Sequence, residues 1–124
     1  MFWKKKKATT QSSSPKSPVV QVLDGVIYST DTARKYSITP EETAFFEAFY
    51  TALQAARKST YCKITRMADG SLSVSSSKAY LGKIKLQGRK TRMQYMTGAY
   101  NSRTVDDRPL EVYIDLLSHW VKSA

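Results

Sequence analysis

The fold is decided by residues 60–97, which read TYCKITRMADGSLSVSSSKAYLGKIKLQGRKTRMQYMT. Apolar and polar side chains alternate along most of this stretch, as they do in strands that cover a core with one face and meet solvent with the other. Short breaks rich in Gly, Ser, Asp and Lys interrupt the alternation. The pattern predicts a four-stranded antiparallel β-meander with strands at 60–67, 72–76, 79–87 and 91–97.

The turns predict which side chains share a face, because a one-residue slip would move every side chain of a strand to the opposite face. A two-residue loop at Gly88-Arg89 sets the register of the last hairpin. The predicted pairs are Leu86 with Thr91, Ile84 with Met93, Gly82 with Tyr95, Lys85 with Arg92, and Lys83 with Gln94.

Three-residue loops are expected at the two earlier turns. A loop at 68–70 places Ile64 beside Val74 on the core face. A loop at 76–78 pairs Val74 with Tyr80. The three hairpins therefore agree on one apolar face for the sheet.

The opposite, open face of the sheet is basic. It is expected to show Lys63, Ser73, Ser75, Leu81, Lys83, Lys85, Arg92, Gln94 and Met96. From Gly70 through Val105 the sequence holds no Asp or Glu but seven Lys and Arg residues. Solvated faces usually mix both signs, so this stretch favours an anionic partner. Lys85 opposite Arg92 is a like-charge pair, which costs a few tenths to about 1 kcal/mol unless an anion lies between the two or water and salt screen them.

We predict that this face contacts the phosphate backbone of a nucleic acid. The residues expected to bind the backbone are Lys83, Lys85, Arg89, Lys90 and Arg92. Two of them, Arg89 and Lys90, lie at the hairpin tip, where they reach a groove or a second phosphate. Base stacking is not expected, because Tyr80 and Tyr95 point inward by parity and leave mainly Tyr61 exposed.

Two helices are expected to pack on the core face, one before and one after the meander, which gives an α+β fold. The segment Thr39-Pro40-Glu41-Glu42 supplies an N-cap, a proline at the first helical position and a glutamate in capping-box spacing, so the first helix begins there and runs to about Lys58. The last helix is expected to begin near Asp106-Asp107, with Pro109 in its first turn. Residues 98–103 are expected to form a flexible loop before it.

The N-terminal region differs in composition from the rest. Residues 1–18 are rich in Lys and Ser and are predicted to form a disordered basic arm before a single domain at 19–124. Between Val19 and Tyr28, apolar residues surround the turn pair Asp24-Gly25. This pattern predicts a short hairpin or an extended strand at the edge of the domain.

The chain has 124 residues and a formal net charge of +10, half of it in residues 1–19. This charge favours nucleic acid or an anionic membrane surface as partner, although many small basic proteins bind neither. A single cysteine excludes an internal disulfide, and the start lacks the apolar region of a secretory signal. No segment approaches the roughly 20 apolar residues of a membrane span. We expect a cytoplasmic protein.

Catalytic signatures are missing from the sequence. One Cys and one His leave no pair for nucleophilic catalysis or metal binding, and the glycines form no phosphate-binding loop. Cys62 falls on the core face, where an inert buried thiol is expected. His119 lies near the end of the last helix, where a surface or capping role is expected. We therefore expect a binding protein rather than an enzyme, without cofactor or metal.

Two other kinds of partner remain open. An acidic protein would pair with an exposed sheet edge or cover Leu81 and Met96. An anionic membrane would contact the start of the arm. The aromatic and basic residues available there are Phe2, Trp3, Lys4, Lys5, Lys6 and Lys7.

Overall fold

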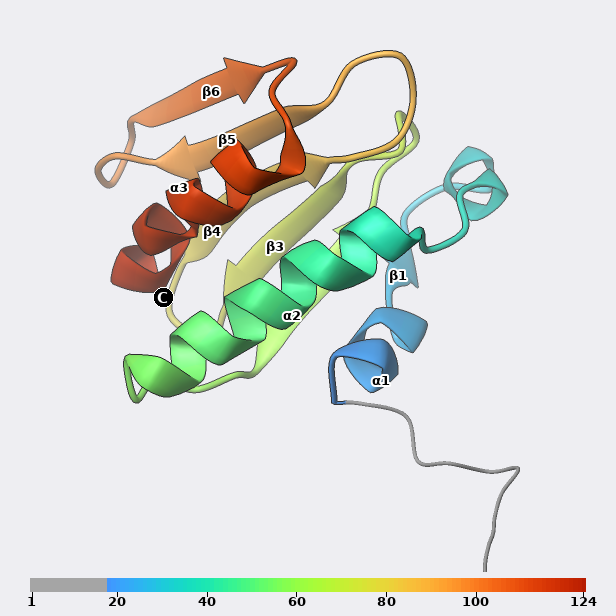
Figure 1. Ribbon diagram of the computed structural model, residues 1–124. Coiled ribbons are helices and arrows are strands. Elements are labelled where there is room, and N and C mark those ends of the chain that lie inside the picture. Colours follow the sequence, from blue (N-terminus) through green and yellow to red (C-terminus); the bar gives the residue numbers. More distant parts are fainter. Residues whose placement is uncertain (1–17) are drawn as a thin grey trace, which may run out of the picture.

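The computed structural model describes residues 18–124. The arm expected at 1–18 lies outside these residues except for Pro18, so its disorder and its membrane contact stay predictions. Within the described part of the chain, a six-stranded mixed sheet is accompanied by three α-helices (Figure 1). The class is α+β, as predicted, but the sheet is larger than the predicted four strands.

The sheet follows chain order from β1 to β6. Its strands are β1 Ile27–Tyr28, β2 Cys62–Arg66, β3 Leu72–Ser76, β4 Tyr80–Lys85, β5 Arg92–Met96 and β6 Ser102–Asp106. β1 pairs in parallel with β2, and each later pair of neighbours is antiparallel. The predicted meander is therefore the centre of the sheet, and the two edge strands are additions to it.

The edge strands lack the alternation that reveals the central ones. Both residues of β1 are exposed, and β6 has one half-buried side chain, Val105, among exposed neighbours. Residues 98–103, expected to form a loop, contribute Ser102 and Arg103 to β6. These strands add backbone hydrogen bonds to the sheet with little apolar burial, so hydrophobic periodicity does not detect them.

The two long helices cover one face of the sheet (Figure 1). α2 spans Pro40–Ala55 and begins with the predicted capping box, in which Glu42 N donates to Thr39 Oγ1 and Thr39 N donates to Glu42 Oε1. α3 spans Leu110–Ser123, so the predicted start near Asp106-Asp107 is too early. The first of these aspartates belongs to β6, and the second turns the chain with a φ of 57°.

The prediction of a hairpin or strand at 19–28 is wrong for most of its length. Residues Pro18–Asp24 form the short helix α1. Val19 and Leu23 are four residues apart, so they share one face of the helix, and both are buried where α1 packs against α2. A single 3-10 turn, η1 at Thr32–Lys35, then connects β1 to α2.

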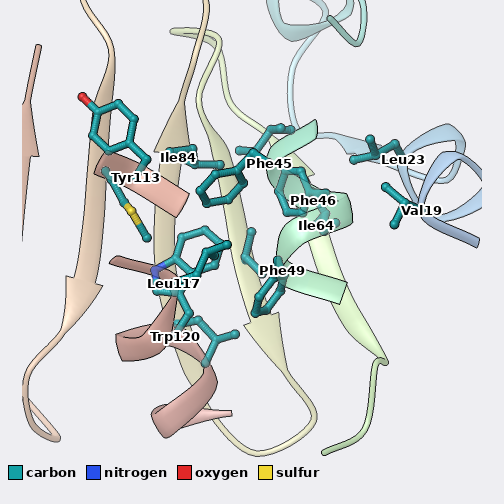
Figure 2. Close-up of a cluster of buried hydrophobic side chains, with 14 of the residues drawn as sticks. Val19, Leu23, Phe45, Phe46, Phe49, Ile64, Ile84, Tyr113, Leu117 and Trp120 are labelled. Atoms are coloured by element: carbon teal, nitrogen blue, oxygen red, sulfur yellow. The ribbon is translucent and has the colours of Figure 1, made fainter. Parts of the chain in front are cut away.

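The core lies between the sheet and the long helices. Trp120 of α3 is fully buried and packs edge-to-face on Phe45 and Phe49 of α2, with ring centroids 5.4 and 5.3 Å away (Figure 2). The inward side chains of the central strands complete this core with Ile64, Leu72, Val74, Ile84, Met93 and Tyr95. The face predicted to be apolar is thus the one that the helices cover.

The predicted register of the last hairpin is confirmed for four pairs. These are Gly82 with Tyr95, Lys83 with Gln94, Ile84 with Met93, and Lys85 with Arg92. The same register places the side chains of the two lysines and of Arg92 on the open face, because Ile84 and Met93 between them are buried.

The predicted pairing of Val74 with Tyr80 is wrong. A bulge sets Val74 opposite Gly82 and Ser75 opposite Tyr80. The extra residue reverses the inward and outward alternation at the start of β4. Leu81, expected on the open face, is therefore fully buried, while Tyr80, expected in the core, lies on the open face with 36% of its surface exposed.

Candidate nucleic-acid interface

A recess of about 200 Å³ opens on the sheet face that points away from the helices. Its lining residues are Asp69, Ser71, Lys83, Lys85, Arg92, Gln94 and Thr104. Strands β4, β5 and β6 supply five of these side chains, and the turn between β2 and β3 supplies the other two. Three cationic side chains and three uncharged polar ones therefore converge on one concave surface.

Three of the five residues predicted to bind nucleic acid line this recess. Lys85 lies directly opposite Arg92, and Lys83 precedes Lys85 by two residues on the same face of β4. The other two, Arg89 and Lys90, are exposed in the loop between β4 and β5 and do not line the recess. The structure thus brings the strand residues together and leaves the loop residues beside them.

Arg92 has an acidic partner that the predicted strands do not include. Strand β6 sets Asp106 opposite Arg92, and Arg92 Nε donates to Asp106 Oδ1 over 2.7 Å. This hydrogen bond and the charge of Asp106 raise the pKa of Arg92. The like-charge contact with Lys85 is offset within the protein and does not by itself require an anionic ligand. Because the bond engages Nε, the two terminal nitrogens of the guanidinium remain for other acceptors.

Asp69 brings a second carboxylate to the edge of the recess. Ser71 N and Ser71 Oγ both donate to Asp69 Oδ1, over 3.0 and 2.7 Å. Partial burial opposes ionisation of Asp69, but these hydrogen bonds and the charges of Lys85 and Lys83 outweigh it and lower the pKa of the carboxyl group. Asp69 is therefore ionised at neutral pH, and the lining combines three cations with one anion.

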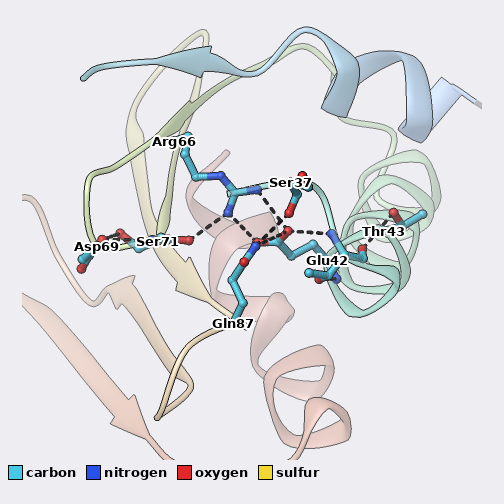
Figure 3. A network of polar contacts seen from close by, with 9 residues as sticks. Ser37, Glu42, Thr43, Arg66, Asp69, Ser71 and Gln87 are labelled. Carbon is cyan, nitrogen blue, oxygen red and sulfur yellow. Dashed lines mark hydrogen bonds and ion pairs between the residues drawn. The ribbon is translucent and has the colours of Figure 1, made fainter. Parts of the chain in front are cut away.

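A buried ion pair holds the turn that carries Asp69. Arg66 and Glu42, whose side chains are fully buried, are joined by Nη1–Oε2 and Nη2–Oε1 contacts of 2.7 and 3.1 Å (Figure 3). Arg66 Nη1 also donates to Gly70 O over 2.9 Å, and Gln87 Nε2 donates to Glu42 Oε1 over 3.1 Å. The Glu42–Arg66 pair thus connects the β2–β3 turn, through Arg66, with the loop after β4, through Glu42.

The sequence contains a signal for this ion pair, namely a charged residue at a position of β2 that the alternation assigns to the core. Arg66 lies opposite Leu72, on the core face of β2. A charged side chain at a core position requires a buried counter-charge. Glu42 supplies that charge in addition to its predicted capping role.

Gln94 connects the recess with the core and with the neighbouring surface. Its side chain accepts a hydrogen bond from the Tyr80 hydroxyl over 2.9 Å and donates to Ser102 Oγ over 3.2 Å. Its backbone carbonyl accepts a hydrogen bond from Trp120 Nε1 over 3.0 Å. Gly82 permits this approach, because its φ is +146° and an added Cβ would lie 1.9 Å from the same carbonyl oxygen.

The remaining candidate groups lie outside the recess. Cys62 is half-buried, and burial raises the pKa of its thiol to about 11. His119 stacks on Tyr95, with ring centroids 4.1 Å apart. Among residues 18–124, no three His, Cys, Asp or Glu side chains are grouped to hold a metal ion. The same residues contain no helix with the length and apolar character needed to cross a membrane.

No family model, curated protein or solved structure matches the chain.

Proposed function

We propose that the open face binds the phosphate backbone of a nucleic acid, with one phosphate in the recess. The observation that carries this proposal is the convergence of Lys83, Lys85 and Arg92 on one concave surface. Phosphate oxygens accept short, charge-assisted hydrogen bonds from ammonium and guanidinium groups. The hydroxyl group of Thr104 adds an uncharged donor in the same recess.

The balance of charge suits a phosphodiester. Two carboxylates lie near the three cations: Asp69 at the edge of the recess and Asp106 beside Arg92. The net charge of these five side chains is therefore +1. A phosphodiester carries one negative charge. Binding of this kind depends on the backbone rather than on the base sequence, and added salt weakens it.

Arg89 and Lys90 extend the basic surface beyond the recess. Both are exposed in the loop that joins Lys85 to Arg92. A backbone that leaves the recess toward this loop brings a second phosphate against them. The five predicted residues then act on two neighbouring phosphates, three on the first and two on the second.

An acidic protein is the main competing partner. One contact predicted for it is wrong, because Leu81 is fully buried and forms no exposed patch with Met96. Such a partner would instead pair with the outer edge of β6. Polyglutamate, which presents carboxylates without phosphates or bases, serves to distinguish the two classes of partner.

The test is fluorescence anisotropy of the nuclease-treated protein with short, labelled single-stranded and duplex oligonucleotides across a salt series. Lys85→Glu/Arg92→Glu reverses two charges in the recess. Arg34→Glu/Lys122→Glu makes the same change of charge at exposed positions outside it. We expect the recess variant to lose about tenfold or more in affinity at low salt and to show a shallower salt dependence, whereas the control stays close to wild type.

If both variants weaken oligonucleotide binding equally, the loss is explained by the change in net charge, which argues against a specific site in the recess. Competition by polyglutamate as effective as that by unlabelled oligonucleotide would instead favour an acidic protein. Far-UV circular dichroism and thermal unfolding check that each variant is folded.

A further inference from the structure

Tyr80 is an exposed aromatic residue that is held against the sheet. Its hydroxyl donates to Gln94 Oε1 on β5 over 2.9 Å. Partial burial raises the pKa of Tyr80, and the influence of the Ser73 side chain on β3 opposes that rise. The hydroxyl is therefore anchored to the neighbouring strand β5.

Between Tyr80 and Lys83, the open face of β4 carries no side chain. Along β4 from Tyr80, Leu81 turns into the core and Gly82 has no side chain. The next side chain on the open face is that of Lys83. The Tyr80 hydroxyl reaches Gln94, which pairs with Lys83, so the side chain extends from Tyr80 toward the recess residue Gln94. Because its hydroxyl end is fixed, the ring is a pre-organised flat surface, and stacking a ligand on it costs less conformational entropy than stacking on a mobile side chain.

This flat surface adjoins the recess. Gln94, which holds the Tyr80 hydroxyl, also lines the recess, and so does Lys83. A ligand that combines an anionic group with a flat aromatic group contacts both at once. Nucleotides have this composition. In a single strand the base is free to stack on a protein side chain, whereas in a duplex it is paired and stacked on its neighbours.

We propose that Tyr80 is a base-stacking site for an unpaired nucleotide whose phosphate occupies the neighbouring recess, so that the open face prefers single-stranded nucleic acid. This inference rests on the proposed backbone binding and adds the class of nucleic acid to it. It differs from the expectation from sequence, which favours backbone contact over base stacking because strict alternation places Tyr80 in the core. The bulge between Val74 and Ser75 is the physical reason for this difference.

The test compares affinities for three probes of equal length: a single-stranded oligonucleotide, the same strand with abasic positions, and the duplex. The variants are Tyr80→Leu, which removes the ring, and Tyr80→Phe, which keeps the ring without the hydroxyl. Tyr100→Leu is the matched control, because Tyr100 is 98% exposed in the β5–β6 loop.

Wild-type protein is expected to bind the intact single strand more tightly than either other probe. Tyr80→Leu should lose about tenfold in affinity for the intact strand and little for the abasic strand. Tyr80→Phe and Tyr100→Leu should stay within about threefold of wild type. The comparison of intact and abasic strands on wild-type protein tests the proposal even if Tyr80→Leu fails to fold.

Three outcomes would overturn the stacking site: a wild-type preference for the duplex, equal wild-type affinity for intact and abasic strands, or equal losses for both strands in Tyr80→Leu. Backbone binding would still stand if Lys85→Glu/Arg92→Glu weakens all three probes. Conversely, loss of base-dependent affinity in Tyr80→Leu without any effect of the recess variant would show that the recess assignment is wrong. Absence of binding to every probe would overturn both proposals.

Discussion

At the scale of single residues, Asp69 opposes the proposed ligand most directly. Asn at this position keeps an oxygen that accepts hydrogen bonds from Ser71 and removes the negative charge. We expect Asp69→Asn to tighten binding of a single-stranded oligonucleotide by about two- to fivefold at low salt, with the gain shrinking as salt rises. Fluorescence anisotropy measures this change, and Asp115→Asn on the exposed side of α3 provides a control with the same change of charge.

The effect of Asp69→Asn on oligonucleotide affinity can also contradict the proposed phosphate site. Unchanged or weaker binding would argue against a phosphate in the recess, because the carboxylate lies at the edge of that recess. Equal tightening by Asp69→Asn and Asp115→Asn would indicate long-range attraction rather than a local site.

Single residues also show how far the sequence predicts this site. Lys83, Lys85 and Arg92 are placed together correctly, because a short loop and strict alternation fix the register of β4 and β5. Tyr80 is misplaced, because the bulge reverses the alternation before Gly82. A glycine inside a strand pattern indicates a possible bulge. Gly82 therefore indicates an irregularity in β4, but it does not predict which side chains the bulge reverses.

At the scale of secondary-structure elements, the Glu42–Arg66 pair joins α2 to the sheet and connects the β2–β3 turn with the loop after β4. Arg66→Met leaves a buried carboxylate without its counter-charge, and we expect a loss of about 3–5 kcal/mol in the free energy of unfolding. Adding Glu42→Gln should recover part of the loss, because no unpaired buried charge then remains. Urea unfolding measures each change.

The Arg92–Asp106 pair is the natural comparison for this prediction. Its contact is also 2.7 Å long, but both side chains are about half-exposed. Asp106→Asn should therefore leave the urea midpoint without a measurable change. An effect of Arg66→Met no larger than that of Asp106→Asn would contradict a structural role for the buried pair.

Elements also differ in how well the sequence predicts them. α2 and the central strands combine strong periodicity with recognisable caps or turns, and all are confirmed near their predicted positions. β6 buries little, so its pattern resembles that of a loop. α1 spans only seven residues and is stabilised by packing on α2. A tertiary contact of this kind cannot be predicted from the local sequence pattern. The missed β6 matters for the site, because it supplies Thr104 and Asp106.

At the scale of the whole molecule, charge is divided between the two layers. The open face carries the cations of the recess. The outer surface of α2 and α3 carries one exposed cation, Lys122, and the exposed acids Glu41, Glu47, Glu111 and Asp115. An anionic polymer is therefore attracted more strongly to the open face than to the outer surface of the helices. Binding is therefore expected to perturb the open face and to leave the outer surface of the helices unchanged.

The most direct test of the central claim is a two-dimensional ¹H–¹⁵N NMR titration of the full chain with a single-stranded oligonucleotide. We expect the largest shifts at Lys83, Lys85, Arg92, Gln94 and Thr104, and a shift of the Trp120 indole N–H through its hydrogen bond to Gln94 O. A Trp3→Phe variant identifies that indole resonance, because the sequence contains two tryptophans. Shifts confined to the outer surface of α2 and α3, or no shifts at a concentration that saturates the anisotropy signal, would contradict binding at the open face.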